Sequence, residues 1–185
     1  MAELYIALIH HPVLDRRGRV VTSAITSLDL HDLARSARTY GARAMYVIHP
    51  VAELREFAAR LRDHWMEGHG RQHDALRREA LSRMRIVANL DEATAEIEGE
   101  QLSSPLLVHT SARTQGGLSY AALRAQLETG TQPMLLLFGT GFGLAPEVLQ
   151  RADLVLAPIL GPDEYNHLSV RAATSIILDR LRSRA

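Results

Sequence analysis

The chain has 185 residues, 46% of them apolar; its 21 basic residues balance 21 acidic ones, and it contains no cysteine. This length and composition fit one globular domain, expected over residues 1–185, and the missing cysteines exclude disulfides and thiolate metal sites. No apolar run approaches the roughly 20 residues of a membrane span, and no basic leader precedes the first apolar segment, so we expect a soluble cytoplasmic protein.

Strands and helices alternate along the N-terminal part of the chain. Residues 4–9 and 44–48 are predicted strands. A helix is predicted over 27–40, because apolar residues recur along one helix face at positions 30, 33, 34 and 37. Thr26 is its expected N-cap, with Asp29 as the capping-box partner, and Gly41 is the expected stop.

The same alternation continues to the C-terminus. A second helix carries apolar residues at positions 54, 57, 58, 61 and 65, and the polar stretch 67–82 is expected to be partly helical. Later strands are predicted at 85–88, 105–109, 134–138 and 154–157. Further helices are predicted from Asp91, over about 118–127, after Pro146 and from Leu168 to Arg182. This order predicts an α/β fold, with a mostly parallel sheet that has helices on both faces.

Two segments that follow late strands form a candidate ligand site. FGTGFGL occupies 138–144, directly after the apolar run 133–137, and NHLSVRAA occupies 166–173 at the start of the last helix. Open α/β sheets bind ligands at the carboxyl ends of their strands, and glycine lets a backbone approach a ligand closely. The second segment adds amide, imidazole, hydroxyl and guanidinium groups, which a purely structural turn does not need.

The glycine segment and the histidines also have simpler interpretations. A dinucleotide fingerprint belongs after the first strand, with an acidic residue about 20 positions later, so an NAD site is disfavoured here. His64, His69 and His73 lack the spacing and the carboxylates of a metal site, so a solvated surface is favoured and no metal is expected. The segment 10–12, His-His-Pro, either lines a site or forms a turn.

The charged residues of the first predicted helix are equally open to a simple reading. Asp29 can act as a helix cap and nothing more, and Arg35 and Arg38 can be solvent-facing charges. For each of these residues considered alone, we favour a purely structural role over a functional one.

Several segments together give the whole chain a family resemblance. They are HHPV at 10–13, TSLDLHDLARSARTYG at 26–41, HW at 64–65, HTSAR at 109–113, FGTGFGL at 138–144 and NHLSVRAATSIILDRL at 166–181. The chain resembles the SPOUT superfamily of S-adenosylmethionine (SAM)-dependent RNA methyltransferases. Within it, the chain is most similar to a bacterial family whose domain stands alone or is fused to a tRNA (guanine-N1) methyltransferase.

The resemblance implies a C-terminal trefoil knot, a homodimer of two packed knots, and SAM held bent by three loops. Those loops match 109–114, 138–143 and 156–168 here. The cofactor-binding residues implied are His109, Thr110, Ser111, Ala112, Phe138, Gly139, Thr140, Gly141, Gly143, Leu156, Ile159, Leu160, Asn166, His167, Leu168 and Ser169. The chemistry of the side chains agrees, because glycine turns expose backbone groups and the apolar members can form an adenine slot.

The resemblance also implies a set of catalytic candidates. They are Asp29, His31, Arg35, Asn166, His167, Ser169 and Arg171. In the ribose 2′-O-methyltransferase branch an arginine lies six residues before a glycine, as Arg35 lies before Gly41. This chain departs from that branch at four places. The branch has asparagine at the positions of Asp29 and Ser169 and serine at the position of Arg171. The glutamate of the branch's middle motif is absent from this chain, which has Gly141 near that place.

These departures leave the proton acceptor open. Arginine stays charged in proteins and cannot accept a proton. We therefore expect Arg35 to grip a phosphate or to stabilise a developing alkoxide. Asp29, His31 and His167 are the candidate bases by chemical type.

The sequence therefore predicts a homodimeric SAM-dependent methyltransferase that acts on tRNA or rRNA, with a ribose 2′-oxygen favoured as the target. Three alternatives remain: methylation of a base nitrogen by the same fold, a SAM- or nucleotide-binding module without catalysis, and an NAD-dependent oxidoreductase.

Overall fold

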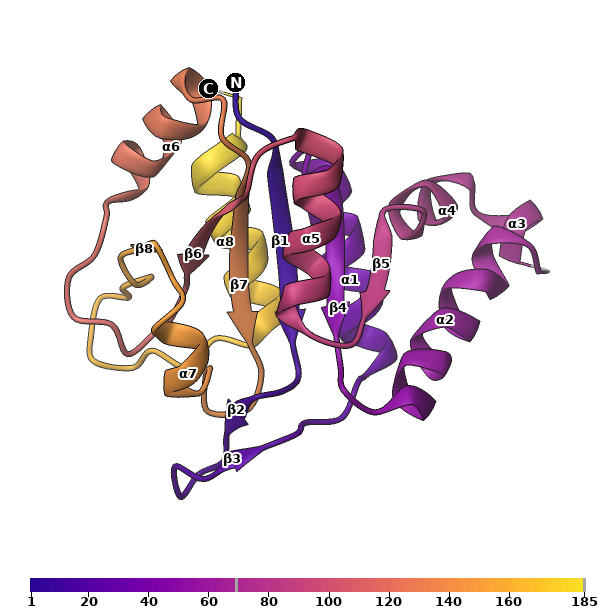
Figure 1. Ribbon diagram of the computed structural model, residues 1–185, viewed down its shortest axis with the longest axis horizontal. Helices are drawn as coiled ribbons and strands as arrows, with labels where there is room; N and C mark the ends of the chain where they lie inside the picture. Colours follow the sequence, from indigo (N-terminus) through magenta and orange to yellow (C-terminus); the bar gives the residue numbers. More distant parts are fainter. Residues whose placement is uncertain (69, 185) are drawn as a thin grey trace.

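The structure, a computed structural model, describes residues 1–68 and 70–184. Its centre is a six-stranded, wholly parallel sheet with the strand order β5-β4-β1-β7-β6-β8 (Figure 1). Its strands are β1 (Leu4–Ile9), β4 (Ala44–Ile48), β5 (Met84–Val87), β6 (Leu106–His109), β7 (Met134–Gly139) and β8 (Leu154–Val155). The predicted α/β class is confirmed.

Helices cover both faces of the sheet. They are α1 (Ser27–Thr39), α2 (Ala52–Met66), α3 (Gly70–His73), α4 (Ala75–Leu81), α5 (Leu90–Gln101), α6 (Tyr120–Thr129), α7 (Pro146–Leu149) and α8 (Val170–Arg182). Buried residues of α1, α2, α4, α6 and α8 share one apolar core, and those of α5 and α7 share the other. The result is a three-layer sandwich (Figure 1).

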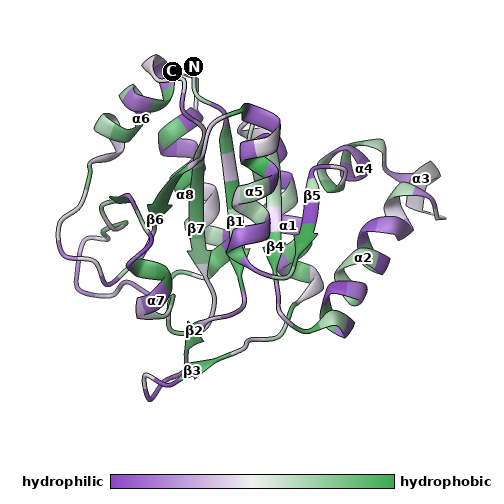
Figure 2. Ribbon diagram, viewed as in Figure 1, coloured by the Kyte–Doolittle hydropathy of each residue, from purple (hydrophilic) through white to green (hydrophobic). Residues whose placement is uncertain are grey.

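The central strands are buried on both sides, which explains their continuous apolar sequence. Side chains of β1 alternate between the two cores: Leu4, Ile6 and Leu8 enter one, and Tyr5, Ala7 and Ile9 enter the other. Strands β1, β4 and β7 therefore form the hydrophobic centre of the molecule (Figure 2).

Helix α1 has the boundaries and the buried face that its sequence predicts. The Thr26 hydroxyl accepts the backbone N–H of Asp29 at 3.2 Å, and the four positions 30, 33, 34 and 37 are fully buried. Gly41 follows with a φ of +71°, a left-handed conformation that favours glycine at a helix end. The helix stops at Thr39, one residue before the predicted end.

Several details differ from the sequence prediction, including shifts of one or two residues at other element boundaries. A small antiparallel hairpin, β2 (Val13–Leu14) with β3 (Val20–Val21), was not predicted, because two-residue strands are too short to show a period. The last helix starts at Val170 and not at Leu168, because the Ser169 hydroxyl caps it by accepting the Ala172 N–H at 3.2 Å. The last strand ends at Val155, two residues early. His69 lies outside the described residues.

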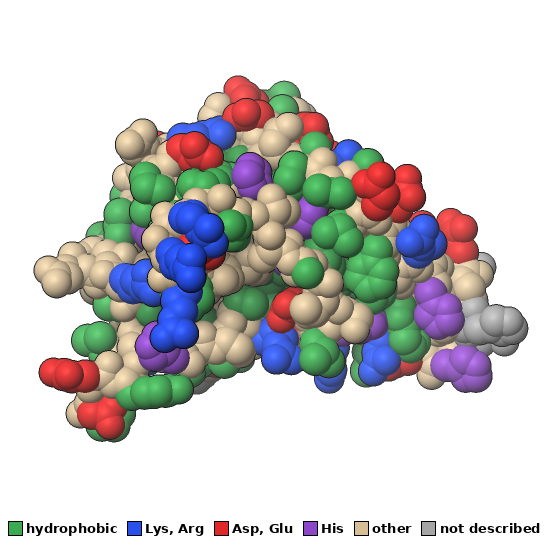
Figure 3. Space-filling model, turned by 90° about the horizontal axis from the view of Figure 1, so that it is seen from below, with side chains coloured by type: hydrophobic (Ala, Val, Ile, Leu, Met, Phe, Trp, Pro, Cys, Tyr) green, Lys and Arg blue, Asp and Glu red, His purple; other side chains and the backbone are tan. Residues whose placement is uncertain are grey.

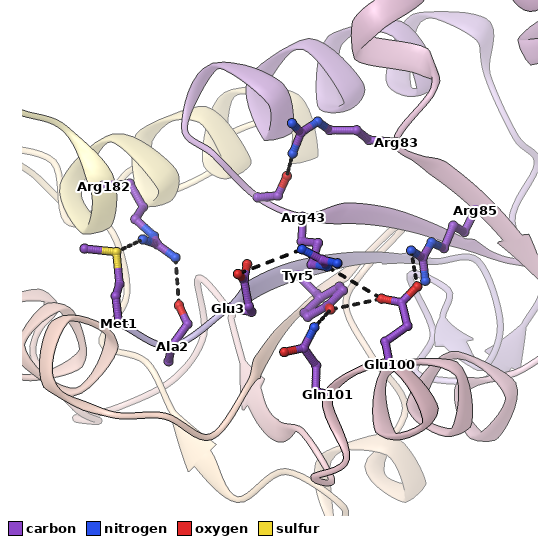
Figure 4. Close-up of polar contacts among 11 residues, drawn as sticks. Met1, Ala2, Glu3, Tyr5, Arg43, Arg83, Arg85, Glu100, Gln101 and Arg182 are labelled. Atoms are coloured by element: carbon purple, nitrogen blue, oxygen red, sulfur yellow. Dashed lines mark hydrogen bonds and ion pairs between the residues drawn. The ribbon is translucent and has the colours of Figure 1, made fainter.

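A polar network closes the amino-terminal edge of the sheet (Figure 4). The Tyr5 hydroxyl donates to Glu100 at 3.2 Å and accepts from Gln101 at 2.9 Å, and Arg85 pairs with the same glutamate. These contacts fasten α5 to β1 and β5, and the ligand-binding edge lies at the other end of the strands. Among the described residues, no helix has the length and apolarity needed to cross a membrane.

Candidate cofactor and substrate site

A cavity of about 810 Å³ lies at the carboxyl ends of the central strands. Its size falls within the range of small-molecule sites. Three segments form most of its wall: residues 110–113 after β6, residues 138–143 at the end of β7 and in the turn that follows it, and the segment that leads from β8 into α8. The segment 23–24 and the start of α1 complete it. Figure 3 looks onto this edge of the molecule.

The glycine turn after β7 is fixed to its neighbours. The Thr140 hydroxyl donates to the Ile9 carbonyl at 3.2 Å and contacts the Ser23 hydroxyl. Gly141 has a φ of +60°, and a Cβ at this position would lie 2.9 Å from the Leu14 carbonyl oxygen. The turn therefore needs glycine both for its conformation and for the close approach of the hairpin backbone.

The loop after β6 is held by side-chain hydrogen bonds. The Thr110 hydroxyl donates to the Leu137 carbonyl at 2.7 Å, and Asn166 Nδ2 donates to the Ala112 carbonyl at 3.2 Å. The second bond joins this loop to the segment that precedes α8. His109 is buried behind the loop, where burial lowers its pKa, and its Nδ1 has no partner among the described residues.

The segment after β8 runs close to the loop that precedes α6. The Leu118 N–H donates to the Val155 carbonyl at 2.7 Å, and the Ala157 N–H donates to the Leu118 carbonyl at 2.9 Å. Gly117, with a φ of +106°, is so close that a Cβ there would lie 2.9 Å from the Ala157 nitrogen. Two chain segments distant in sequence are thus paired beside the cavity.

A second cavity of about 550 Å³ lies between α1 and α8. Arg35 and Arg171 line it, and Ser169 lines both this cavity and the first. Arg35 is exposed and forms no ion pair with another described residue. The cofactor-sized cavity therefore adjoins an arginine-lined one through the cap of α8.

Asp29 and Arg171 form an ion pair across this boundary. The Arg171 Nε lies 3.3 Å from Asp29 Oδ1, and its Nη1 donates to Asp32 at 3.4 Å. Asp29 also accepts the Thr26 hydroxyl proton at 2.6 Å, and only 17% of its side chain is exposed. Asp29 lines the first cavity, so the pair fixes a carboxylate at its wall.

Most predicted site residues gather around the first cavity. Its wall includes Asp29, Thr110, Ser111, Ala112, Phe138, Gly139, Thr140, Gly141, Gly143, Ile159, Asn166, His167, Leu168 and Ser169. The carboxyl or imidazole groups of Asp29, Glu164 and His167 are the proton-accepting side chains among its described lining residues. Arg35 and Arg171 line the second cavity.

Four predicted residues lie elsewhere. His109 and Leu156 are buried behind the wall, and Leu160 is 73% exposed outside it. His31 lines neither cavity, because its ring packs edge-on against Trp65 with 5.8 Å between ring centroids. Burial and the nearby Arg77 guanidinium lower the pKa of His31. Its structural role is to hold α1 against α2.

Several further lining residues were not among the individually predicted ones. They are Ser23, Ala24, Arg113, Tyr120, Phe142, Ala157, Pro158, Glu164, Val170, Ala173 and Ile177. Arg113, Phe142, Ala157, Pro158 and Glu164 nevertheless lie within the three loops that the family resemblance implies. Ser23 and Ala24 follow the unpredicted hairpin, and no sequence pattern indicated them.

A buried histidine pair supports the floor of the site. His10 and His49 are fully buried, with ring centroids 5.6 Å apart. His10 Nδ1 lies 3.0 Å from the Ser23 hydroxyl, and His49 Nε2 donates to the Ser23 carbonyl at 3.1 Å. Burial, helped by His49, lowers the pKa of His10 to about 4. Both rings therefore hold Ser23 at the cavity wall.

The described residues contain no group of three or more His, Cys, Asp or Glu side chains that could hold a metal ion. The wall of the first cavity instead fits an organic ligand that has a polar and an apolar part. A backbone turn with hydroxyl and amide groups can bind the polar part, and the side chains of Phe138, Ile159 and Leu168 can contact the apolar part.

Known proteins are similar to this chain in sequence and in fold. A family model described as SAM-dependent RNA methyltransferase matches residues 3–183. An uncharacterised protein of Aquifex aeolicus is 39% identical over 182 residues, which are 98% of this chain and 89% of that protein. A Nitratidesulfovibrio vulgaris protein named tRNA (guanine-N(1)-)-methyltransferase is 43% identical over 178 residues, 96% of this chain but 41% of that protein.

A solved structure shows the same arrangement of elements. The SpoU methyltransferase AviRb from Streptomyces viridochromogenes superposes with a TM-score of 0.60 at 19% identity, covering 97% of this chain and 58% of that one. The chain therefore has the fold of this SpoU methyltransferase structure. The chain belongs to the SAM-dependent RNA methyltransferase family. Its cofactor is SAM and its substrate is RNA, so the NAD-dependent oxidoreductase alternative has no support.

Proposed function

We propose that this protein transfers a methyl group from SAM to a ribose 2′-oxygen of tRNA or rRNA. The observation that carries the proposal is the shared wall of the two cavities. Ser169 lines both cavities. The Asp29 carboxylate lines the first cavity, and the Arg35 and Arg171 guanidinium groups line the second. A nucleotide whose phosphate lies against the arginines can extend its ribose toward the carboxylate.

Bound SAM supplies a methyl carbon activated by a positively charged sulfur. The protein must place the 2′-hydroxyl in line with that carbon and remove its proton. Asp29 is the proton acceptor we propose, because Thr26 and Arg171 hold its carboxylate at the cavity wall. His167 is exposed, and His31 lines neither cavity.

Arg35 and Arg171 bind the phosphate of the target nucleotide in this proposal. Guanidinium groups offer several fixed N–H donors and stay charged, which suits a phosphodiester. Ser169, between the two cavities, orients the ribose. Backbone and side-chain groups of the loops 110–113, 138–143 and 157–169 would hold the cofactor, and Ile159 and Leu168 would offer apolar walls to its adenine.

Methylation of a base nitrogen is the second candidate, and a relative's name favours it. The Nitratidesulfovibrio protein is named a tRNA (guanine-N(1)-)-methyltransferase, but this chain spans only 41% of its length. The named activity can therefore reside in the remainder of that protein. A non-catalytic SAM-binding module is disfavoured, because it would need neither the fixed carboxylate nor the arginine-lined cavity.

We further propose a single knotted domain that acts as a homodimer in the cytoplasm, where tRNA and rRNA are available. The pairing of Leu118 with Val155 and Ala157 supports a knotted crossing. Exposed apolar side chains on α1 and just before α8 support a dimer face: Leu28 is 61% exposed and Leu168 is 45% exposed.

Methyl transfer from tritiated SAM tests the function. Purified protein is incubated with unmethylated bulk tRNA and rRNA, and the labelled RNA is digested to nucleosides for mass spectrometry. A 2′-O-methylnucleoside is the expected product. A methylated base would replace the ribose assignment by the second candidate, and no transfer to either RNA would favour the non-catalytic module.

A further inference from the structure

The hairpin β2–β3 projects from the carboxyl end of the sheet and carries a basic tip (Figure 1). Its turn, residues 15–19, has the sequence Asp-Arg-Arg-Gly-Arg, and all three arginines are exposed. Because the formal charges of the whole chain cancel, this cluster makes a local positive surface. The view onto this edge shows arginine side chains gathered in a row on the same face (Figure 3).

Asp15 shapes the turn and neutralises only one of its arginines. Its Oδ1 accepts the backbone N–H groups of Arg17 at 2.8 Å and Arg19 at 2.9 Å. Its Oδ2 pairs with the Arg19 guanidinium at 2.7 Å. The side chains of Arg16 and Arg17 form no ion pair or hydrogen bond with the rest of the described chain. The turn therefore presents two uncommitted guanidinium groups on a fixed backbone.

The hairpin is joined directly to the cofactor turn. The Leu14 N–H donates to the Gly143 carbonyl at 2.9 Å, and the Phe142 N–H donates to the Leu14 carbonyl at 2.9 Å. Phe142 and Gly143 line the first cavity. Across the cavity wall, the Arg113 guanidinium lies 5.6 Å from the centre of the Phe142 ring. The basic tip thus stands beside the cavity mouth, and a further arginine extends its charge.

We propose that Arg16 and Arg17 bind backbone phosphates of the substrate RNA next to the target nucleotide. Exposed arginines on a preformed turn bind phosphate without sequence selectivity, and such contacts position a nucleic acid over a reactive centre. The proposal rests on the RNA methyltransferase function above and adds a contact outside both cavities. It predicts a salt-dependent contribution to RNA affinity that leaves SAM binding unchanged.

Equilibrium binding of fluorescently labelled, unfractionated tRNA tests this contact, measured between 50 and 200 mM salt with S-adenosylhomocysteine present. Each lost phosphate contact lowers the slope of log affinity against log salt by about one. Arg16→Ala/Arg17→Ala should therefore reduce the slope by about two and weaken binding at low salt by roughly tenfold or more. Melting temperature and calorimetric SAM affinity should match the wild type.

Arg43→Ala/Arg60→Ala is the matched control. It removes the same charge at two arginines outside the hairpin. Arg43 lies at the amino-terminal end of β4, and Arg60 lies on α2. Its salt slope should stay at the wild-type value. An unchanged slope and affinity in the hairpin variant, with a wild type that binds and methylates RNA, would refute the hairpin contact and leave the proposed function standing. Equal losses in both double variants would refute it as well. A wild type that neither binds nor methylates RNA would overturn both proposals.

Discussion

Asp29 and Arg171 contact each other, and each departs from the ribose-methylating pattern that the sequence resembles. Asparagine and serine stand at these places in that pattern, whereas here a carboxylate and a guanidinium lie 3.3 Å apart. The two departures therefore compensate electrostatically. Because only 17% of the Asp29 side chain and 36% of the Arg171 side chain are exposed, removing one partner leaves a poorly solvated charge.

A double-mutant cycle separates the structural role of this pair from its chemistry. Asp29→Asn and Arg171→Ser should each lower the free energy of unfolding, and the double variant should recover about 1 kcal/mol of coupling. Methyl transfer behaves differently if Asp29 accepts the proton: it should fall about a hundredfold or more in Asp29→Asn and stay low in the double variant. Full activity in Asp29→Asn would exclude Asp29 as the base.

Gly141→Leu should weaken SAM binding strongly. The residue has a left-handed φ of +60°, and a Cβ would lie 2.9 Å from the Leu14 carbonyl oxygen, so the turn must move where it lines the cavity. Calorimetric titration with SAM measures the loss. Gly99→Ala on α5, with open space around it, is the control and should bind like the wild type. Equal affinities in all three folded proteins would contradict this role for the turn.

The sequence predicts regular elements well and contacts between distant elements poorly. Helix α1 repeats its apolar residues with helical spacing, so its buried face could be derived residue by residue. Hairpin β2–β3 could not be predicted from the sequence, because its strands have two residues each and depend on pairing with the glycine segment 138–144. The contact of Asp29 with Arg171 likewise depends on how α1 and α8 pack.

His31 shows why residue type alone mislocates a site residue. It lies two positions after Asp29 on the same helix, a rotation of about 200°. Side chains two positions apart on a helix do not face each other, so Asp29 and His31 cannot both reach one cavity. Asp29 lines the cofactor cavity, and His31 packs against Trp65 on the side of α2.

Acidification should destabilise the fold through His10. Its pKa is lowered from 6.5 to about 4 in the folded state, so between these values the unfolded chain binds the additional proton. The stability that neutral, buried His10 contributes to the fold is fully present above pH 6.5 and is lost as the pH falls toward 4. The loss in the free energy of unfolding has an upper limit of about 3 kcal/mol. Denaturant unfolding at several pH values should therefore show a shallower pH dependence in His10→Gln.

Leu28→Glu should weaken the proposed homodimer. Leu28 is 61% exposed on α1, and a charge there would be desolvated in an interface. Light scattering at micromolar concentration should give twice the 20.5 kDa chain mass for the wild type and a smaller mass for the variant. Leu102→Glu, at the end of α5 on the other sheet face, should stay dimeric. A wild type at 20.5 kDa would exclude the dimer.

Arg35→Ala should reduce methyl transfer far more than it reduces stability or SAM affinity. Arg35 is exposed, lines the arginine-lined cavity and has no ion pair with a described residue, so its removal should change stability by no more than about 0.5 kcal/mol. If its guanidinium holds the target phosphate in the transition state, the rate should fall roughly a hundredfold or more.

Arg38→Ala, on the same helix, provides the comparison for Arg35→Ala. Arg38 lines neither cavity and pairs with Glu79 on α4, with 2.6 Å between its Nε and the carboxylate, so its loss should cost stability of about 1 kcal/mol or less and leave the rate unchanged. Initial rates of methyl transfer at saturating SAM, with melting temperatures measured in parallel, distinguish the two roles. If both variants methylate RNA at the wild-type rate, the phosphate contact in this cavity must come from another group, and Arg171 is then the next arginine to replace.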